Sequence, residues 1–509
     1  MSHLKTLKNG SDIRGIAITT AEEEANLTAN EAEKIALGMV KWLTTTKGLA
    51  AKREEGQLKI AIGHDSRLSA DELKNAMING LTSVGVHVID VALATTPAMF
   101  MATQFADYQC DAAVMITASH LPYYFNGIKI FTREGGAEHE DIDSIVDYAE
   151  GEIGLSQFQG SVEKRELIPL YAADLVSKIR QGIPGQAQQP LKGFHIIVDA
   201  GNGAGGYFAK EVLDVLGADT SGSQFLEPDG HFPNHMPNPD NKEAMASIQA
   251  AVLQHKADLG VIFDTDVDRA AVVDQAGNVL NRNNLIAVLA KIVFDEHPGT
   301  TIVTNSPTSS HLKDFIESLG GKQYRYISGY RNVINQAITL NAEGVQTELA
   351  IETSGHAAFK ENYFLDDGAY VIAKILMLLP QLATSGQTLG ELIGHLKQPV
   401  EAQEVRFKIA GDAYRSYGEQ VIKELANFIE ETLGLSIDPE NEEGIRSDVR
   451  GEFGSGWFLL RMSLHEPLLV LQVENDQVGK NQLVFERLSH FFEKYDGLDR
   501  SALTTILQK

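Results

Sequence analysis

The sequence is poor in cysteine, in basic residues and in long apolar runs, and each shortage excludes a class of protein. One cysteine, Cys110, among 509 residues excludes an intramolecular disulfide framework and a cysteine-rich zinc site, and it is typical of a reducing compartment. The 43 Lys and Arg are outnumbered by 69 Asp and Glu, and the formal charge of −26 disfavours nucleic acid as the main partner. We therefore expect a cytoplasmic protein whose anionic ligands meet local clusters of cationic side chains.

The shortage of apolar runs also disfavours export and membrane insertion. The first 15 residues, MSHLKTLKNGSDIRG, contain no apolar core of signal-peptide length, so we expect no export signal. The longest apolar stretch, Tyr370–Leu382, is interrupted by Lys374 and Pro380 and is shorter than the roughly 20 residues that span a bilayer. We predict a core helix there and no membrane partner.

Short β-branched runs alternate with longer amphipathic segments, a pattern typical of α/β domains. The predicted strands are Lys59–Gly63, Val86–Val91, Ala112–Ile116, Phe194–Asp199, Leu259–Phe263, Ala271–Asp274 and Thr301–Thr304. The predicted helices include Asp71–Ser83, Ala209–Leu216, Lys242–Gln254 and His311–Leu319. We expect three related α/β domains with mixed sheets, over 1–175, 176–280 and 281–390, and a C-terminal α+β domain over 391–509. In the last, GWFLLRMSLHEPLLVLQVE predicts a hairpin with its chemistry in the turn.

Three carboxylates stand at a spacing of two where a predicted strand ends, in LGVIFDTDVDRAAVVD. Asp264, Asp266 and Asp268 repel one another by roughly 4 kcal/mol per pair at about 4 Å and an effective dielectric of about 20. A bound Mg²⁺ would remove that penalty and leave room for a phosphoryl oxygen. The alternative is an acidic turn exposed to water. An EF-hand is disfavoured, because its required Gly and Glu positions hold Arg269 and Gln275.

Two motifs also allow different functions. FDTDVD resembles the nucleophile motif of haloacid dehalogenase-type phosphatases, in which Asp264 would be the nucleophile and Asp266 the acid/base. Residues 201–206, GNGAGG, match the dinucleotide-binding pattern after a predicted strand, with Asp219 at a tolerable distance. The alternative for this run is a tight turn that requires glycine.

Ser119 lies in a polar interruption after the predicted strand Ala112–Ile116, within MITASHLPYYFNGIKIF. A serine hydroxyl is a poor nucleophile until a base or a metal acts on it, but a phosphoserine can donate its phosphoryl group. Three Asp and a phosphoserine could share one Mg²⁺. The alternative is a loop serine that only forms hydrogen bonds.

Seven motifs in register along the whole chain resemble those of the α-D-phosphohexomutase superfamily, to which phosphomannomutase/phosphoglucomutase belongs. TASHLP resembles the phosphoserine loop, DTDVDR the metal loop, IETSGH the sugar loop and RMSLHEP the phosphate loop. SDIRGI, GHDSRLSA and PDGHFPNHMPNPD resemble three further elements of the family. The resemblance implies four domains around a central cleft.

The resemblance also implies roles for individual residues. Ser119 would carry the phosphoryl group, and its phosphate would bind one Mg²⁺ per chain together with Asp264, Asp266 and Asp268. The group around the transferred phosphoryl would comprise Arg14, His120, Lys129 and Arg269, with His356 as a proton-transfer residue. The substrate-binding group would comprise Glu352 and Ser354 on the sugar hydroxyls and Arg331, Arg461, Ser463 and His465 on the non-reacting phosphate.

The implied reaction interconverts hexose 1-phosphate and hexose 6-phosphate through a hexose 1,6-bisphosphate, which also serves as the activator. The chain departs from the family pattern at Leu121, Thr265, Ile351 and His465, among further positions. Thr353 stands where amino-sugar members more often carry Gln, so we favour mannose and glucose phosphates over the amino sugar of a phosphoglucosamine mutase. Two further hypotheses are the Mg²⁺-dependent phosphatase and a non-catalytic phosphosugar-binding protein. We expect a monomer or homodimer.

Overall fold

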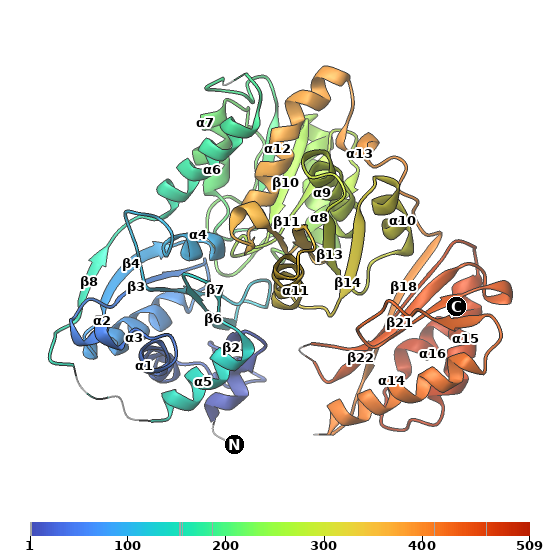
Figure 1. Cartoon of the computed structure of the whole chain (residues 1–509), viewed down its shortest axis with the longest axis horizontal. Coiled ribbons are helices and arrows are strands. Elements are labelled where there is room, and N and C mark those ends of the chain that lie inside the picture. The colour runs from blue at the N-terminus through green and yellow to red at the C-terminus, as the bar shows by residue number, and fades with distance from the viewer. Residues whose placement is uncertain are drawn as a thin grey trace. The chain divides into compact units, whose positions relative to one another are not determined.

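The computed structural model describes residues 3–151, 154, 156–185, 187–411, 413–464 and 466–508 (Figure 1). The chain divides into two compact units. Unit 1 comprises Met1–Leu285 and Ser354–Glu391, and unit 2 comprises Ile286–Thr353 and Leu392–Lys509. Each unit is described by itself.

The first sheet of unit 1 has the strand order β1-β2-β6-β5-β3-β4-β8, with β7 paired to β6. Its strands are β1 (Lys8–Asn9), β2 (Asp12–Ile16), β3 (Lys59–His64), β4 (His87–Leu93), β5 (Ala112–Ile116), β6 (Phe125–Thr132), β7 (Gly135–Gly136) and β8 (Ser161–Lys164). β3 runs parallel to β4 and β5, whereas β6 is antiparallel to β5 and places Lys129 opposite Met115. The sheet is therefore mixed, and the chain leaves β5 and returns along β6 through the Ser119 loop.

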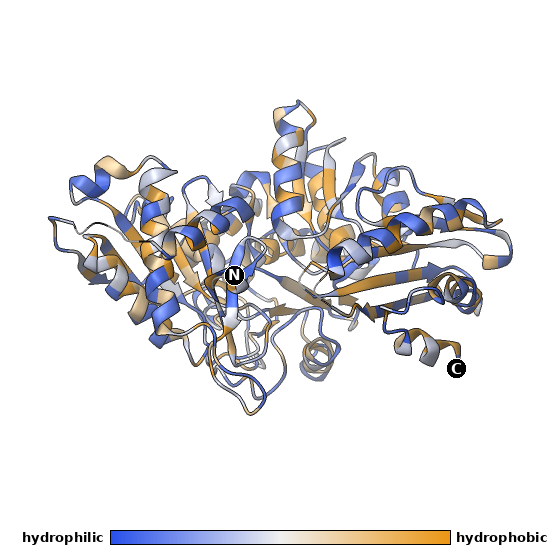
Figure 2. Ribbon diagram, turned by 90° about the horizontal axis from the view of Figure 1, so that it is seen from below, coloured by the Kyte–Doolittle hydropathy of each residue, from blue (hydrophilic) through white to orange (hydrophobic). Residues whose placement is uncertain are grey.

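Helices accompany this sheet, and most of them bury apolar side chains. They are η1 (His3–Leu7), α1 (Ala29–Thr45), α2 (Ala50–Glu54), α3 (Ala70–Ser83), α4 (Thr96–Met101), α5 (His139–Ala149) and α6 (Ile168–Gly182). In α1 a capping box between Thr28 and Glu31 begins the helix, and Ile35, Met39 and Trp42 are fully buried. Figure 2 shows helices that carry both hydrophilic and hydrophobic residues, whereas several strands are hydrophobic along much of their length.

The second sheet of unit 1 has the order β12-β11-β10-β9. Its strands are β9 (Ile196–Asp199), β10 (Leu259–Phe263), β11 (Ala270–Asp274) and β12 (Val279–Leu280), with helices η2 (Phe208–Leu213), α7 (Asp214–Leu216) and α8 (Lys242–His255). β10 and β11 are antiparallel and fully buried, and the loop that connects them carries Asp264, Asp266 and Asp268. The helix expected over Ala209–Leu216 is present, but η2 is a π-helix rather than an α-helix.

Unit 1 also contains β16 (Ala357–Phe359), η3 (Lys360–Asn362), β17 (Leu365–Asp366) and α12 (Gly368–Ser385). Helices α9 (Arg282–Glu296) and α13 (Leu389–Leu392) cross the boundary between the units. Among the described residues, α12 is the one helix long and apolar enough to cross a membrane, and 61% of it is buried inside the protein. This helix is longer than the apolar stretch from which it was predicted, and its burial is that of a core helix.

Unit 2 holds a parallel set of strands and an antiparallel sheet. β13 (Thr301–Asn305) pairs in parallel with β14 (Lys322–Tyr326) and β15 (Thr347–Ile351), accompanied by α10 (Ser310–Ser318) and α11 (Tyr330–Ala342). The C-terminal sheet has the order β18-β22-β21-β20-β19. Its elements are β18 (Glu401–Lys408), α14 (Tyr414–Glu430), β19 (Leu435–Ile437), β20 (Ile445–Val449), η4 (Gly451–Phe453), β21 (Gly456–Met462), β22 (Leu468–Asn475), α15 (Lys480–Phe492) and α16 (Ser501–Leu507). The predicted C-terminal hairpin is confirmed as β21 and β22.

Candidate active site

Ser119 is held in a strained conformation at the end of β5. Its φ of 51° lies in the left-handed region, which costs a non-glycine residue about 1–2 kcal/mol, and only 2% of it is exposed. Its backbone N–H donates to Thr117 Oγ1 at 2.9 Å, and its Oγ donates to Asp264 Oδ2 at 2.8 Å. The serine hydroxyl is therefore directed at the acidic loop, 145 residues away in sequence.

The loop that carries Ser119 is held by Arg67, a residue that the sequence did not single out. Its guanidinium is fully buried and lies 3.4 Å from the buried carboxylate of Asp65. The guanidinium donates hydrogen bonds to the backbone carbonyls of Ser119 (2.6 Å), Leu121 (2.6 Å), Pro122 (2.8 Å) and Phe125 (2.9 Å). One side chain thus satisfies four carbonyls of an irregular loop, which offsets the strain at Ser119.

We expect Arg67→Ala to destabilise the first domain by about 3–5 kcal/mol, because it leaves the buried Asp65 charge and four loop carbonyls without their partner. In differential scanning calorimetry the midpoint temperature of the first unfolding transition should fall by roughly 6 °C or more. The exposed Arg133→Ala is the matched control and should shift it by less than about 1 °C. A melting temperature for Arg67→Ala that equals the control value would refute the role of Arg67 in holding the loop.

Asp264, Asp266 and Asp268 converge in the connection between β10 and β11. All three are buried, and one carboxylate oxygen of each lies within 4.8 Å of the others. Oδ1 of Asp266 and Oδ1 of Asp268 are buried without a hydrogen-bond partner among the described residues. Buried carboxylate oxygens without a partner are costly unless a cation binds them, so this donor set fits a hard divalent cation such as Mg²⁺. The alternative expectation of an acidic turn exposed to water is wrong.

Two cations partly neutralise the three carboxylates. Lys129 Nζ donates to Asp268 Oδ2 at 2.5 Å and to Asp266 Oδ2 at 3.0 Å. Arg269 Nε donates to Asp264 Oδ2 at 3.3 Å, and its Nη2 donates to Ser119 Oγ at 3.3 Å. Three carboxyl groups and two cationic side chains are thus gathered around one serine hydroxyl.

The pKa values of the carboxyls diverge within this cluster. Burial raises the pKa of Asp264 well above its usual range, and Asp268 and Asp266 add to this effect. Burial acts in the same direction on Asp268, but Lys129, His356 and Arg269 outweigh it and lower the pKa of Asp268. The unequal environments favour one proton on Asp264, which a bound divalent cation would displace.

His120 is a neutral neighbour of Ser119. Burial, followed by the positive charges of Arg269 and Arg14, lowers its pKa well below the usual value. Its Nδ1 lies 2.6 Å from Arg269 Nη2 and 3.3 Å from Ser119 Oγ. A neutral imidazole can accept the hydrogen bond from Arg269 at Nδ1, so His120 orients that guanidinium. Arg14, in β2, donates to Asp12 Oδ2 at 2.8 Å.

His356, which is partly buried, pairs with the buried Asp366, a second residue that the sequence did not single out. His356 Nδ1 lies 2.5 Å from Asp366 Oδ2 and 3.9 Å from Asp268 Oδ1. Burial disfavours the charged imidazole, but Asp366 and Asp268 outweigh it and raise the pKa of His356 to about 9. An imidazole oriented by a carboxylate is the arrangement that general acid–base catalysis requires. Ser354 lies in the turn before His356, in the same unit.

The remaining candidate residues of the third domain lie in unit 2. Glu352 follows β15, is 5% exposed, and its Oε1 accepts a hydrogen bond from the backbone N–H of Gly329 at 2.7 Å. Gly329 directly precedes α11, whose first turn carries Arg331. Arg331 Nη2 donates to Asn335 Oδ1 at 3.2 Å. The structure therefore brings the sugar loop and the Arg331 segment together.

The C-terminal phosphate loop approaches the same segment within unit 2. Arg461 Nη1 lies 3.9 Å from Glu443 Oε1, and Glu443 Oε2 accepts a hydrogen bond from Ser328 Oγ at 2.6 Å. Ser463 lies between β21 and β22, where its Oγ accepts from the backbone N–H of Glu466 at 3.4 Å. His465 lies outside the described residues.

The glycine run at 201–206 serves close packing against the acidic loop. A Cβ at Gly203 would lie 2.7 Å from the carbonyl oxygen of Thr265, and one at Gly206 would lie 2.1 Å from the carbonyl oxygen of Leu226. Asp219, the residue that a dinucleotide site would use for a ribose, instead accepts from the backbone N–H of Ser221 at 2.9 Å. A tight turn that requires glycine therefore accounts for this run.

Comparison with known proteins identifies the family. Three family models match the sequence, and each is described as a phosphoglucomutase/phosphomannomutase alpha/beta/alpha domain. Domain I matches residues 5–153, domain II residues 171–277 and domain III residues 281–399. The chain belongs to this family. It is thus a member of the α-D-phosphohexomutase superfamily and an isomerase, as the motifs predicted. The domain boundaries that we expect from the sequence, at residues 175, 280 and 390, remain a prediction.

Relatives match this phosphohexomutase over more than four fifths of its length. It is 31% identical to the phosphoglucomutase of Neisseria gonorrhoeae over 88% of the chain and 90% of that protein. It is 30% identical to the phosphomannomutase/phosphoglucomutase of Pseudomonas aeruginosa over 83% of this chain and 84% of that protein. A phosphoglucomutase/phosphomannomutase family protein from Burkholderia thailandensis has the same fold, with a TM-score of 0.76 and 24% identity over 97% of this chain and 98% of that protein. The predicted fold class of three α/β domains and a C-terminal α+β domain is confirmed.

Proposed function

We propose that this phosphohexomutase interconverts mannose and glucose 1-phosphates with their 6-phosphates through a phosphoserine at Ser119. One observation carries the proposal: Ser119 Oγ lies 2.8 Å from Asp264 and 3.3 Å from Arg269, within one buried cluster of carboxylates and cations. Family membership favours this reaction over an aspartyl phosphatase with Asp264 as nucleophile. Relatives named for glucose and mannose phosphates favour these sugars over the amino sugar of a phosphoglucosamine mutase.

The proposed reaction has two transfers. In the first, the bond between phosphorus and Ser119 Oγ breaks, the phosphoryl group joins the free hydroxyl of the hexose monophosphate to form a hexose 1,6-bisphosphate, and Ser119 Oγ departs as an alkoxide beside Arg269. In the second, that serine oxygen attacks the other phosphoryl group of the reoriented bisphosphate, and the sugar oxygen leaves. Arg269 and Lys129 provide positive charge around the phosphoryl oxygens in both transfers, where such charge lowers the barrier most.

The carboxylates Asp264, Asp266 and Asp268 would hold the metal ion together with the phosphate on Ser119. A bound Mg²⁺ supplies charge stabilisation to a phosphoryl oxygen. Lys129 bridges Asp266 and Asp268, so it keeps these two side chains in place for the ion. Thr96 also fixes Asp266, through Oγ1 at 2.5 Å.

His356 would transfer the proton of the reacting sugar hydroxyl. In the first transfer its neutral form accepts that proton, and in the second its protonated form returns a proton to the sugar oxygen that leaves. Asp366 stabilises the protonated form between the two transfers and keeps the ring oriented. On the same proposal, Glu352 and Ser354 bind sugar hydroxyls, and Arg331, Arg461 and Ser463 bind the non-reacting phosphate.

A coupled assay across three substrates tests the proposed function. Glucose, mannose and glucosamine 1-phosphates are each supplied with Mg²⁺ and a trace of glucose 1,6-bisphosphate, and the 6-phosphates are measured together with free phosphate. We expect turnover of the glucose and mannose compounds without phosphate release. Turnover of none of the three would refute the proposed function, and preference for the glucosamine compound would favour a phosphoglucosamine mutase.

Removal of the metal should abolish the reaction reversibly. After treatment with EDTA we expect turnover to fall at least about 10²-fold, because two partly unpaired carboxylates and the phosphate would lose their counter-charge. Addition of Mg²⁺ should restore the rate. Undiminished turnover in a sample shown by elemental analysis to be metal-free would contradict the metal role of the three Asp.

A further inference from the structure

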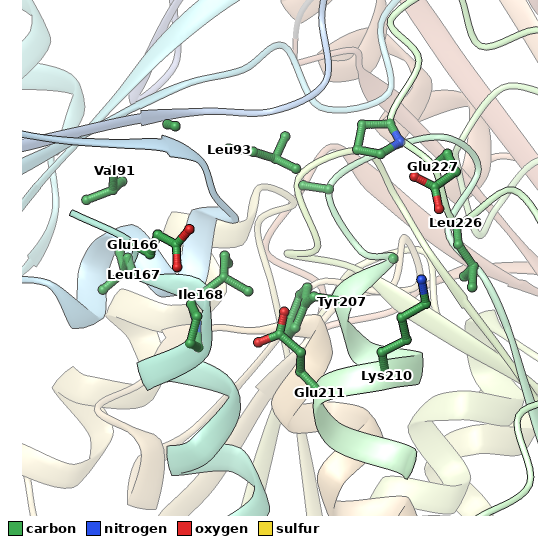
Figure 3. Close-up of a pocket in the computed structure, with 15 residues that line it drawn as sticks. Val91, Leu93, Glu166, Leu167, Ile168, Tyr207, Lys210, Glu211, Leu226 and Glu227 are labelled. Atoms are coloured by element: carbon green, nitrogen blue, oxygen red, sulfur yellow. The ribbon is translucent and has the colours of Figure 1, made fainter. Parts of the chain in front are cut away.

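Unit 1 contains an open cavity of about 400 Å³ that the proposed mechanism does not use (Figure 3). It lies where the end of β4, the start of α6 and the π-helix η2 meet. Its volume is within the range of about 300–1,000 Å³ that small-molecule sites occupy. None of its lining residues belongs to the candidate active site.

One part of the cavity wall is apolar. Val91 and Leu93 from β4, Ile168 from α6 and Leu226 from the loop between α7 and α8 contribute aliphatic side chains. Figure 3 shows these side chains around the open space. Such a wall favours a ligand with a hydrocarbon body over a fully hydrated ion.

The polar part of the wall is acidic. Glu166, Glu211 and Glu227 outnumber the single cation Lys210, so the lining carries a formal charge of −2. Figure 3 shows Glu166 and Glu211 on facing sides of the cavity. Burial raises the pKa of Glu211, and the charge of Glu166 raises it further. A cation between the two carboxylates would relieve their repulsion.

The start of η2 brings three polar side chains to one face of the cavity. Tyr207, directly before η2, and Lys210 and Glu211 within it stand at spacings of three and four residues, which share one face of a helix, and all three line the cavity. The Tyr207 hydroxyl is buried and has no hydrogen-bond partner within the described part of the chain. π-Helical turns are rare and occur often at functional sites, because their wider turn redirects side chains.

The charge and shape of the cavity restrict what it can bind. A sugar phosphate is disfavoured, since one lysine faces three carboxylates. A bare metal ion is disfavoured as well, because among the described residues the groups of three or more close metal-ligating side chains lie elsewhere. The aromatic ring of Tyr207 suits the remaining class, an organic ammonium ion.

We propose that this cavity is a second ligand site, which binds a small organic cation with an apolar body between Glu166 and Glu211. The site lies behind the metal loop rather than in it. Ala204, which lines the cavity, donates its backbone N–H to the carbonyl of Thr265 at 2.8 Å, between two of the proposed metal ligands. The proposal depends on the cavity alone and holds whichever sugar phosphate the enzyme converts.

Saturation-transfer NMR on the full chain tests the site with benzylamine as the probe. We expect saturable binding with a millimolar dissociation constant, the range accessible to a ligand of about eight heavy atoms. Benzyl alcohol, which has the same body without the charge, should bind at least about fivefold more weakly. Absence of saturation by benzylamine in the millimolar range, or equal binding of the alcohol, would overturn the proposal.

Two charge-removing variants locate the bound cation. Glu211→Gln should weaken benzylamine binding at least about fivefold, whereas Glu54→Gln, an exposed glutamate of α2 outside the cavity, should leave it unchanged. Unchanged mutase turnover in Glu211→Gln would show that the variant is folded, since Glu211 has no part in the candidate active site. Equal weakening by both variants, or by neither, would overturn the assignment of the cation to this cavity.

Discussion

Ser119→Ala should lower mutase turnover at least about 10³-fold, because no other described side chain places a hydroxyl against both Asp264 and Arg269. The change removes only a few atoms from a buried loop that Arg67 holds through backbone carbonyls, so the variant should fold and still bind the sugar phosphate. Turnover is measured in the coupled assay, and substrate binding by calorimetry.

Ser144→Ala is the matched control, since this serine lies on α5 and donates only to the carbonyl of Glu140. We expect it to keep the rate of the unaltered enzyme. If Ser119→Ala kept turnover within about tenfold, phosphoserine chemistry would be excluded. Release of phosphate that survives in Ser119→Ala and is lost in Asp264→Asn would instead support the aspartyl phosphatase.

His356→Ala should reduce kcat by about 10²–10⁴-fold, the usual contribution of a general acid–base residue. Asp366→Asn should reduce it less, because the imidazole remains but loses the carboxylate that orients it and stabilises its protonated form. The double variant should be no slower than His356→Ala alone, since two residues that act as a unit are not additive. Additive losses would contradict the pairing.

The pH profile separates this positioning role of Asp366 from a purely structural one. Negative charge on Asp366 raises the pKa of His356, so its removal lowers that pKa. The acidic limb of kcat/KM, where His356 is protonated and cannot accept the proton of the sugar hydroxyl, should therefore move to lower pH in Asp366→Asn. An unchanged acidic limb would show that His356 does not titrate under the influence of Asp366.

The strands that position the site could be predicted from the sequence because they are continuous buried apolar runs. β5 and β10 have the predicted bounds, and β11 begins one residue earlier than expected. The motifs at their ends predicted that Ser119 and the three Asp form one site, and the structure brings them together within unit 1.

Arg67 and Asp366 could not be identified in the same way, because their roles depend on contacts that no local pattern encodes. Arg67 binds carbonyls 52 to 58 residues further along the chain, and a backbone acceptor leaves no trace in residue type. The sequence offered two signals for these residues: the motif GHDSRLSA, which contains Arg67, and the pair of aspartates at 366–367, which contains Asp366. The π-helix η2 also escaped prediction, since a run from Phe208 to Leu213 has the periodicity of an ordinary helix.

The departures from the family pattern are accommodated locally. Thr265 replaces a glycine but does not adopt a positive φ, whereas Val267 has a φ of 66° and takes the left-handed position of the metal loop. Leu121 contributes its backbone, donating to Ala118 O and accepting from Arg67. Neither departure alters the contacts of Ser119 with Asp264 and Arg269.

The most direct test of the central claim is to locate the phosphoryl group on the enzyme. The protein is incubated with glucose 1,6-bisphosphate and Mg²⁺, and the intact mass and the phosphopeptides are then determined by mass spectrometry. We predict a gain of one phosphoryl group, on Ser119, that is lost when the enzyme is mixed with hexose monophosphate. An active enzyme with no phosphoryl group on Ser119, or with one on Asp264, would contradict the account.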